Sequence, residues 1–326
     1  MVKKIYVKPL LNEEQLMKLE GQLLPKNYFK KVIKNEDVDV YKEDGSILLK
    51  LRVNVLPMKN IEKAYNAMIK HARKQTTTRG MVGGPTGEKK LVTNNNKIMS
   101  NIIGYFDTLS VRQKWIFKQA NMKKPICRET SFTGQLPNKW KEVIPLIKDI
   151  DTQYKKLFPK EYKIQHKAAQ STKYVIDNTA FSTITTNLNL QTACHYDKGD
   201  FRKGFGNLVV IEKGKYKGAY TGFPKYGIAV DLRNGDFLGM DVHELHGNEP
   251  IDKISKNAER LSLVSYLREG IYNKCQGLPL VTDSYFEKAR KKAKLFRTRK
   301  HPKREYKKTQ KNKKVKGKSY KKNNIE

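Results

Sequence analysis

The sequence predicts an α+β fold whose core is a double-stranded β-helix, a jelly-roll type of barrel, with flanking helices and a disordered basic C-terminal tail. Three features of the chain support this prediction. Residues 181–267 contain a succession of short segments rich in β-branched and aromatic residues, separated by turns. Side chains of metal-binding types lie at the ends of two of these segments. Amphipathic helical patterns precede them, at residues 58–74 and 139–158.

We expect one domain over residues 1–285, in which an N-terminal helical and hairpin extension covers about 1–90 and the β-helix core covers about 91–285. Residues 12–24 have an acidic first turn and apolar residues at helical spacing, which predicts a helix that Pro25 ends.

Residues 38–55 are typical of a hairpin with a turn at Asp44-Gly45. The helix predicted over residues 58–74 has one apolar side, and we expect its His71 at the surface. Residues 75–90 form a loop rich in Thr and Gly, which either contacts a phosphate or substrate or serves as a connector. The helix at 139–158 contains Pro145, where we expect an irregularity.

The segment at residues 181–190 is a predicted strand, and it leads to His195 and Asp197. Side chains two residues apart on an extended chain share a face, so this imidazole and this carboxylate can hold one metal ion. A distant second histidine would complete the facial triad of non-haem iron(II) oxygenases. The distal ligand is either His246, which follows the strand predicted at 237–242, or His243; the position of His246 before Gly247 favours it.

Further strands are predicted at residues 208–211, 228–232 and from 260 onward, with turns at 213–215 and 233–236. On the last strand Arg260, Ser262, Val264 and Tyr266 share one face. An arginine and a serine two residues apart can hold a carboxylate by a bidentate fork and a hydroxyl. Arg260 and Ser262 are therefore candidates for binding the far carboxylate of 2-oxoglutarate.

Candidate substrate-binding residues follow the proximal ligands, and an aromatic side chain among them can stack on an extruded base. These residues are Asp200, Phe201, Arg202, Phe205 and Asn207. Phe205 has a place in the core as its alternative role.

The three cysteines (Cys127, Cys194 and Cys275) have spacings that predict neither a disulfide framework nor a zinc site, which favours a reducing compartment. Cys194 points away from the His195 face, so we expect it to pack in the interior. The sequence has no stretch typical of a transmembrane helix or a signal peptide, and we expect a protein that is neither secreted nor bound to a membrane.

The net charge of +35 indicates a polyanionic partner, most plausibly nucleic acid. Residues 288–326 carry 19 Lys and Arg against two acidic residues. We expect a helix over residues 283–296 and a basic, disordered tail over 286–326, because blocks of like charge repel one another. The tail contacts phosphates, or it serves solubility or nuclear import.

Five segments of the chain resemble the thymine hydroxylase domain of J-binding proteins, within the TET/J-binding-protein group of base dioxygenases. They are TACHYDKGDF (192–201), GFGNLVV (204–210), GFPKYGIA (222–229), GDFLGMDVHELHGN (235–248) and RLSLVSYLRE (260–269). Fainter similarity extends the match over most of residues 75–270. The resemblance implies iron ligands at His195, Asp197 and His246, and Arg260 on the 2-oxoglutarate carboxylate.

The implied activity is that of an Fe(II)- and 2-oxoglutarate-dependent dioxygenase that uses O2 to hydroxylate the methyl group of a DNA base. Thymine, giving 5-hydroxymethyluracil, is the first candidate and 5-methylcytosine the second. A hydroxylase of protein side chains and a nucleic-acid-binding protein without catalysis are the alternatives. The expected location is inside the cell, in the nucleus or cytoplasm. The sequence does not indicate an oligomeric state.

Overall fold

A nine-stranded sheet forms the centre of the computed structural model, which describes residues 2–76 and 98–300. Its strand order is β1-β3-β4-β12-β8-β15-β7-β5-β6, and every neighbouring pair is antiparallel except β1 with β3. The strands are β1 Lys3–Val7, β3 Val38–Lys42, β4 Ile47–Arg52, β12 Phe237–Met240, β8 Gly206–Lys213, β15 Glu259–Tyr266, β7 Thr183–Leu188, β5 Ser100–Phe106 and β6 Arg128–Glu129.

A second, smaller sheet packs against the first. Its order is β13-β10-β11-β2, and a separate pair, β14 with β9, lies at the periphery. These strands are β13 Gly247–Asn248, β10 Thr221–Phe223, β11 Ile228–Asp231, β2 Lys31–Lys34, β14 Ile251–Lys253 and β9 Tyr216–Gly218. The predicted fold class is confirmed: two facing sheets with flanking helices make up a mixed α and β molecule.

The side chains of β8 show how the layers are held together. Leu208 and Val210 belong to the apolar cluster between the two sheets, whereas Val209 and Ile211 point into the cluster under the helices. This alternation is the period of two that a strand buried on both faces requires.

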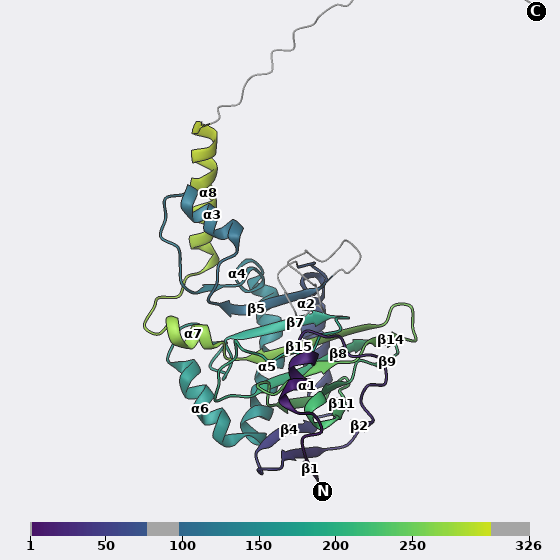
Figure 1. Ribbon diagram of the computed structural model, residues 1–326. Helices are drawn as coiled ribbons and strands as arrows, with labels where there is room; N and C mark the ends of the chain where they lie inside the picture. Colours follow the sequence, from purple (N-terminus) through teal and green to yellow (C-terminus); the bar gives the residue numbers. More distant parts are fainter. Residues whose placement is uncertain (1, 77–97, 301–326) are drawn as a thin grey trace, which may run out of the picture.

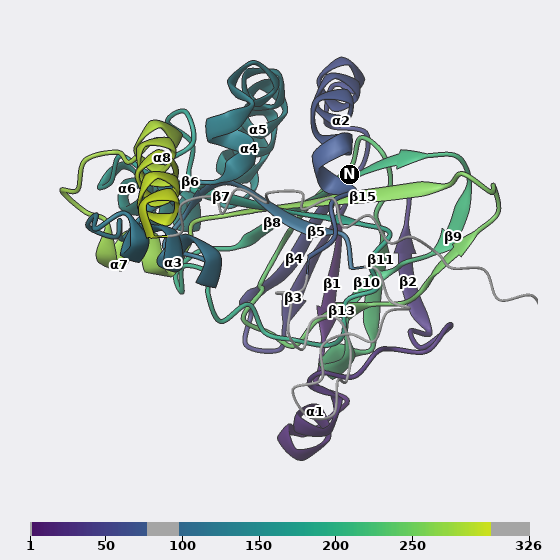
Figure 2. The same ribbon diagram turned by 90° about the horizontal axis from the view of Figure 1, so that it is seen from above.

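Helices cover the outer face of the large sheet. Figure 2 shows α2 and α5 on one side of this sheet and α1 on the other. The helices are α1 Glu13–Leu19, α2 Met58–Ala72, α3 Val111–Gln119, α4 Ser131–Gln135, α5 Pro137–Leu157, α6 Pro159–Gln170, α7 Glu269–Lys274 and α8 Asp283–Lys300, with a 3-10 turn η2 at Pro224–Tyr226. Pro145 lies within α5, which continues through it. No helix in the described ranges is both long and apolar enough to cross a membrane.

The N-terminal residues supply strands to both sheets, so the segment that we predicted as an extension is built into the core. β1, β3 and β4 lie in the large sheet, and β2 pairs in parallel with β11 of the small one. The predicted hairpin at 38–55 is confirmed as β3 and β4. Lys42, at its turn, forms ion pairs with Asp241 and Glu244 in the segment before His246 (3.1 and 3.2 Å). The hairpin therefore anchors the segment that carries the distal histidine.

The first helix is shorter than predicted. It begins at a capping box between Asn12 and Gln15 and ends at Leu19, five residues before the expected end. Gly21 has a φ of 83°, and the chain then runs extended beside the segment that precedes His195. The Gly21 amide donates to the carbonyl of Cys194 (2.7 Å), and the Cys194 amide donates to the carbonyl of Gln22 (2.9 Å). These hydrogen bonds take the place of a further helical turn.

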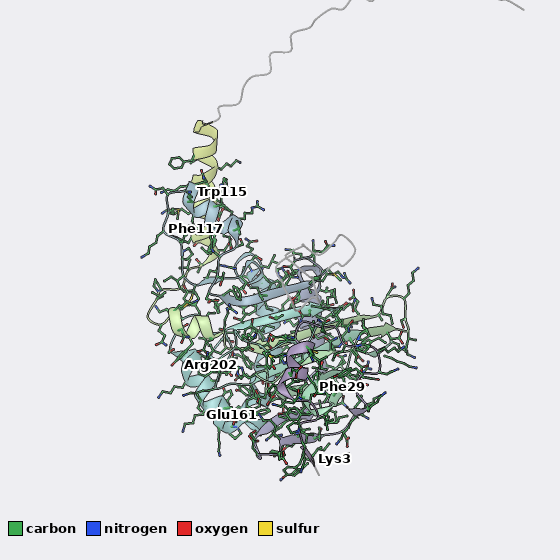
Figure 3. All side chains as sticks on the ribbon, viewed as in Figure 1. Lys3, Phe29, Trp115, Phe117, Glu161 and Arg202 are labelled. Carbon is green, nitrogen blue, oxygen red and sulfur yellow. A yellow bond between two sulfur atoms is a disulfide. The ribbon has the colours of Figure 1, made fainter. Side chains whose placement is uncertain are left out.

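Helices α3 and α8 pack side by side and stand out from the body of the molecule (Figure 1). Phe117 of α3 is fully buried against Phe286 of α8, whereas Trp115, also labelled in Figure 3, is half exposed. The predicted helix at 283–296 is confirmed and continues to Lys300. The remainder of the basic tail, residues 301–326, lies outside the described residues, as does most of the Gly-rich loop predicted at 75–90.

Two predictions about single residues are wrong. His71 is buried on the inner side of α2, 6% exposed, with its ring against Phe132. Cys127 and Cys275 are joined by a disulfide, with their Cα atoms 6.2 Å apart, although they are separated by 148 residues in the sequence. Such a pairing depends on how α7 folds back toward the start of β6, which the spacing of the cysteines does not reveal.

Candidate functional site

His195, Asp197 and His246 lie together at one end of the two facing sheets. Their nearest ligand atoms all lie within 4.8 Å of one another. Asp197 lies between the two imidazoles, with its carboxylate oxygens 3.5 Å from Nε2 of His195 and 3.6 Å from Nε2 of His246. Among the described residues, no other group of three or more His, Cys, Asp or Glu side chains is placed to hold a metal ion. Of the two histidines that competed for the distal position, the structure brings His246 to the cluster.

Backbone hydrogen bonds fix the three residues relative to one another. The amide of His195 donates to the carbonyl of His246 (2.9 Å), and the amide of His246 donates to the carbonyl of His195 (3.0 Å). The amide of Asp197 donates to the carbonyl of Val242 (3.0 Å). Gly247 allows this close approach, because a Cβ at that position would lie 3.2 Å from backbone atoms of Cys194.

The hydrogen bonds of the imidazoles show that this donor set fits a divalent metal ion. Nδ1 of His195 lies 2.7 Å from the carbonyl of Ala193, and Nδ1 of His246 lies 2.9 Å from the carbonyl of Glu244. A carbonyl oxygen only accepts, so each Nδ1 carries the proton and each Nε2 presents a lone pair toward the shared centre. Two imidazoles and one carboxylate are the ligand set of a non-haem iron(II) site with open positions.

The electrostatics of Asp197 agree with this assignment. Burial alone would raise the pKa of its carboxyl group, but interactions with His195 and His246 outweigh burial and hold this pKa well below its usual range. The carboxylate is therefore ionised and available as a ligand. Neighbouring Cys194 is fully buried, and burial raises the pKa of its thiol to about 12, so it packs in the interior as predicted.

A cavity of about 160 Å³ extends from the triad between the two sheets, with Arg260 at its wall. The predicted common face of β15 is confirmed, since Arg260, Ser262, Val264 and Tyr266 all line this cavity. Arg260 is only 6% exposed, and its Nε atom has no hydrogen-bond partner. Its Nη2 atom lies 3.5 Å from Oγ1 of Thr221, and burial lowers the pKa of its guanidinium.

A buried cation with unused donors is costly unless an anion pairs with it. The Arg260 cradle therefore fits the far carboxylate of 2-oxoglutarate. Ser262 is also buried beside this cavity, and its hydroxyl lies 3.5 Å from the carbonyl of Asn187.

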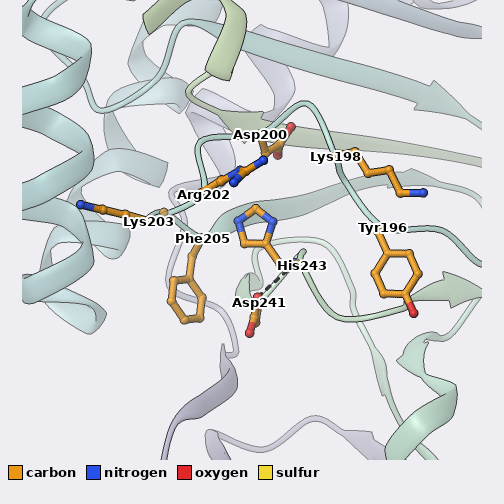
Figure 4. A pocket seen from close by; sticks show the side chains of 9 residues that line it. Tyr196, Lys198, Asp200, Arg202, Lys203, Phe205, Asp241 and His243 are labelled. Carbon is orange, nitrogen blue, oxygen red and sulfur yellow. Dashed lines mark hydrogen bonds between the residues drawn. The ribbon is translucent and has the colours of Figure 1, made fainter. Parts of the chain in front are cut away.

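A second, more open cavity of about 680 Å³ adjoins the first, since Asp200 lines both (Figure 4). Of the residues that we proposed for substrate binding, Asp200, Arg202 and Phe205 line this larger cavity. The ring of Phe205 also packs on that of Phe158, 4.7 Å between centroids, so it belongs to the cavity and to the edge of the core. His243 lines the same cavity and stands apart from the metal cluster.

The other two proposed residues lie elsewhere. Phe201 packs in an apolar cluster with Leu267, with its ring edge against Tyr272. Asn207 is fully buried in β8, where its side-chain amide donates to the carbonyl of Phe205 (3.0 Å). Neither residue lines either cavity.

Several lining residues did not stand out in the sequence. In the larger cavity these are Tyr196, Lys198, Lys203 and Asp241, and in the smaller one Thr185, Asn187, Asn248 and Arg268. The alternation along β15 continues to Arg268 and is the signal that pointed to it. No local pattern points to Thr185 and Asn187, because they belong to β7, which reaches the site only through its pairing with β15.

Comparisons with known proteins agree with this site. Residues 115–269 match the family model Tet_JBP, described as the oxygenase domain of the 2OGFeDO superfamily. The chain is 36% identical over 172 residues to the bifunctional helicase and thymine dioxygenase JBP2 of Leishmania tarentolae, and 34% identical over 174 residues to the thymine dioxygenase JBP1 of Trypanosoma brucei brucei. Each match covers 53% of this chain, and the chain spans 15% and 19% of the length of these relatives.

A solved structure titled "NgTET1 in complex with 5mC DNA" shares the fold. It superimposes with a TM-score of 0.52 over 86% of this chain and 99% of that one, at 16% sequence identity. The resemblance stated from the sequence is confirmed by the family match, and the fold by this neighbour.

Proposed function

Since this chain carries, over residues 115–269, an oxygenase domain of the TET/J-binding-protein family, we propose that it is an Fe(II)- and 2-oxoglutarate-dependent dioxygenase that hydroxylates a methyl group on a DNA base. We further propose thymine as that base, with 5-hydroxymethyluracil as the product. The names of the relatives at 34–36% identity support thymine, and the similarity to them covers about half of this chain.

One observation carries the proposal. The facial His-Asp-His cluster opens into the same cavity as a buried arginine that forms no ion pair among the residues the structure describes. A metal-binding group and an anion-binding group in one enclosed space suit a metal with a dicarboxylate co-substrate.

Each residue of the site has a distinct task in the proposed reaction. His195, Asp197 and His246 would hold Fe(II), and Arg260, with Ser262 beside it, would bind the far carboxylate of 2-oxoglutarate. Iron, 2-oxoglutarate and O2 would supply the oxidation of the methyl group, with succinate and carbon dioxide as co-products. The buried apolar side chains of Val264 and Met240 line the same cavity and would limit the access of water.

We propose DNA as the macromolecular partner. The net charge of +35 provides electrostatic attraction to phosphates. The methyl group of thymine lies in the major groove of a duplex, so the base has to leave the helix to reach the enclosed triad, at a cost of a few kcal/mol. A location inside the cell, where DNA is accessible, follows from this proposed substrate.

The direct test is product analysis. The protein is loaded with Fe(II) without oxygen and then given 2-oxoglutarate, air and DNA that contains thymine or 5-methylcytosine, and nucleosides are analysed by mass spectrometry. A gain of one oxygen on thymidine supports the proposal. Oxidation of 5-methylcytidine alone keeps the reaction class and replaces the substrate. If neither nucleoside changes while DNA is bound, the proposed activity on DNA is wrong.

Replacing the ligands separates chemistry from binding. His195→Ala and Asp197→Ala should each abolish turnover and bound iron, because two remaining ligands hold the metal poorly, while DNA affinity stays within about twofold. The matched control is His166→Ala, since His166 lies on α6 with its Nε2 2.9 Å from the carbonyl of Asn178 and lines neither cavity. Turnover that survives the loss of Asp197 would disprove the metal site.

A further inference from the structure

The larger cavity has room for a nucleotide. Its volume of about 680 Å³ lies within the range typical of small-molecule sites. The side chains around it come from two segments that also carry metal ligands, 196–205 after His195 and 241–243 before His246 (Figure 4). Because Asp200 lines both cavities, a group bound in the larger one lies next to the chamber of the triad.

His243 differs from the two metal-binding histidines in its hydrogen bonds. Nδ1 of His195 and Nδ1 of His246 are both fixed by carbonyl groups. By contrast, neither ring nitrogen of His243 forms a hydrogen bond with any described residue, and its Nε2 is covered by protein atoms without a partner. Its backbone amide, which donates to Asp241 (3.1 Å), is the one polar group of this residue held locally.

This ring is therefore positioned by packing alone, and it can rotate about its Cβ–Cγ bond without breaking a hydrogen bond. A covered polar nitrogen without a partner costs stability, and such groups in folded proteins point to a missing ligand or water. Asp241 is not that partner, because its carboxylate already pairs with Lys42 at 3.1 Å.

The charges around the cavity suit a nucleotide in a nucleic-acid strand. Lys198, Arg202 and Lys203 surround it, and Tyr196 and Phe205 add aromatic surface. Cations at a rim bind phosphates, and a polar group farther inside reads a base edge.

We propose that the larger cavity receives a pyrimidine nucleotide extruded from DNA, that His243 hydrogen-bonds the polar edge of its base, and that Lys198, Arg202 and Lys203 hold the phosphates beside it. This inference rests on the proposed function and assigns its substrate contacts. An imidazole can accept from N3–H of thymine or donate to its carbonyl oxygens, so one residue can orient the ring and its methyl group.

The test measures binding before any chemistry. The full chain, freed of metal with a chelator, is titrated with two fluorescent duplexes that differ at one position, a central thymine that is either paired with adenine or mismatched. A mismatched base costs less to extrude, so the unsubstituted protein should bind that duplex roughly tenfold more tightly. His243→Ala should remove this preference and leave the affinity for the matched duplex unchanged. His243→Gln, which can still donate and accept, should restore much of it.

The rim is tested with the same two duplexes. Arg202→Ala and Lys203→Ala should weaken binding of both and reduce the dependence of affinity on salt, because each phosphate that a cation neutralises releases counterions. If His243→Ala loosens its segment, as shown by a lower melting temperature, His243→Leu replaces it at similar size.

Two results would overturn the inference. One is an unchanged mismatch preference in His243→Ala. The other is loss of Fe(II) binding in His243→Ala, followed by the visible absorption of the anaerobic complex with 2-oxoglutarate, which would make His243 a ligand. The inference and the proposed function fail separately. A His243-dependent mismatch preference without base oxidation rejects the reaction alone, whereas base oxidation that is indifferent to His243 rejects the inference alone.

Discussion

At the scale of single residues, Arg260 shows how a binding site differs from a structural contact. Its guanidinium is almost fully buried and lies next to the hydroxyl of Thr221, yet it forms no ion pair within the described residues. A side chain selected for stability alone would not remain charged there, since desolvation of a cation costs several kcal/mol unless an anion offsets it. The protein retains this cost because the co-substrate would supply the anion.

This imbalance gives a prediction for Arg260→Met. Without 2-oxoglutarate, the apolar side chain should raise the free energy of unfolding by about 1 to 3 kcal/mol, because it removes an uncompensated charge. With Fe(II) and 2-oxoglutarate in the absence of oxygen, the unsubstituted protein should gain stability and the variant should gain almost none. Denaturant unfolding measures both effects. Arg233→Met serves as the control, because Arg233 has an ion-pair partner in Asp231 (2.6 Å) and its loss should destabilise the protein.

His71 predicts a dependence of stability on pH. Burial lowers the pKa of this histidine to about 4, below its usual 6.5. Between these two values the unfolded chain binds the proton and the folded chain does not. Stability from this residue is therefore complete above about pH 6.5 and is lost as the pH falls toward 4, by up to about 3 kcal/mol. In His71→Leu the fall in unfolding free energy between pH 7 and 4.5 should be smaller, whereas His166→Leu should fall like the unsubstituted protein. Equal slopes in all three would contradict the assignment.

At the scale of elements, α1 stabilises the metal site from outside. Leu16 is 2% exposed and packs in the same cluster as Cys194 and Leu245, the residues that precede His195 and His246. Residues 21–24, which follow the helix, run beside Cys194. The N-terminal segment therefore holds both ligand-bearing segments in place.

We expect Leu16→Ala to lower the free energy of unfolding by about 2 to 4 kcal/mol and to weaken Fe(II) binding, because the cavity it leaves loosens the packing under both histidines. Met17→Ala on the same helix is the matched control, since Met17 is 68% exposed and should change neither quantity. Iron affinity and denaturant unfolding are measured for both variants. A loss of stability without any loss of iron affinity would show that α1 does not support the site.

How much of the site the sequence predicted depended on the distance over which each signal acts. His195 and Asp197 could be paired because their geometry is set within three residues, and the face of β15 followed from strict alternation. The choice of His246 over His243 and the role of Gly247 depended on a bridge between segments about 50 residues apart, so the sequence left the two histidines as alternatives. His71 was misplaced because α2 buries a wider stripe than its strongest apolar positions suggest.

At the scale of the whole molecule, long-range pairing escaped the sequence. Nothing local shows that β3 and β4 extend the sheet beside β12, or that β2 joins β11, and these pairings make the N-terminal residues part of the core. The Cys127–Cys275 disulfide was missed for the same reason. Composition was more informative, because the excess of Lys and Arg predicted a polyanionic partner before any fold was known.

The distribution of charge gives a prediction for the C-terminal end. Residues 297–326 carry 14 Lys and Arg against two acidic residues, and truncation after Phe296 keeps the α8 residues that pack on α3. We expect the truncated protein to bind DNA more weakly, and its log–log salt slope to fall by about 0.9 for each phosphate that the tail no longer neutralises. A full-length variant with these lysines and arginines replaced by glutamine should behave like the truncation. An unchanged slope would exclude the tail from DNA binding.

The mutual backbone hydrogen bonds between His195 and His246 make the protein a chelator that is assembled before its metal arrives. In a flexible peptide the ion itself must pay the entropy of gathering its ligands, whereas here the folding of two sheets has already done so. Removing iron should therefore leave the circular dichroism spectrum and the exchange of these two amides nearly unchanged, and reloading should be complete without refolding.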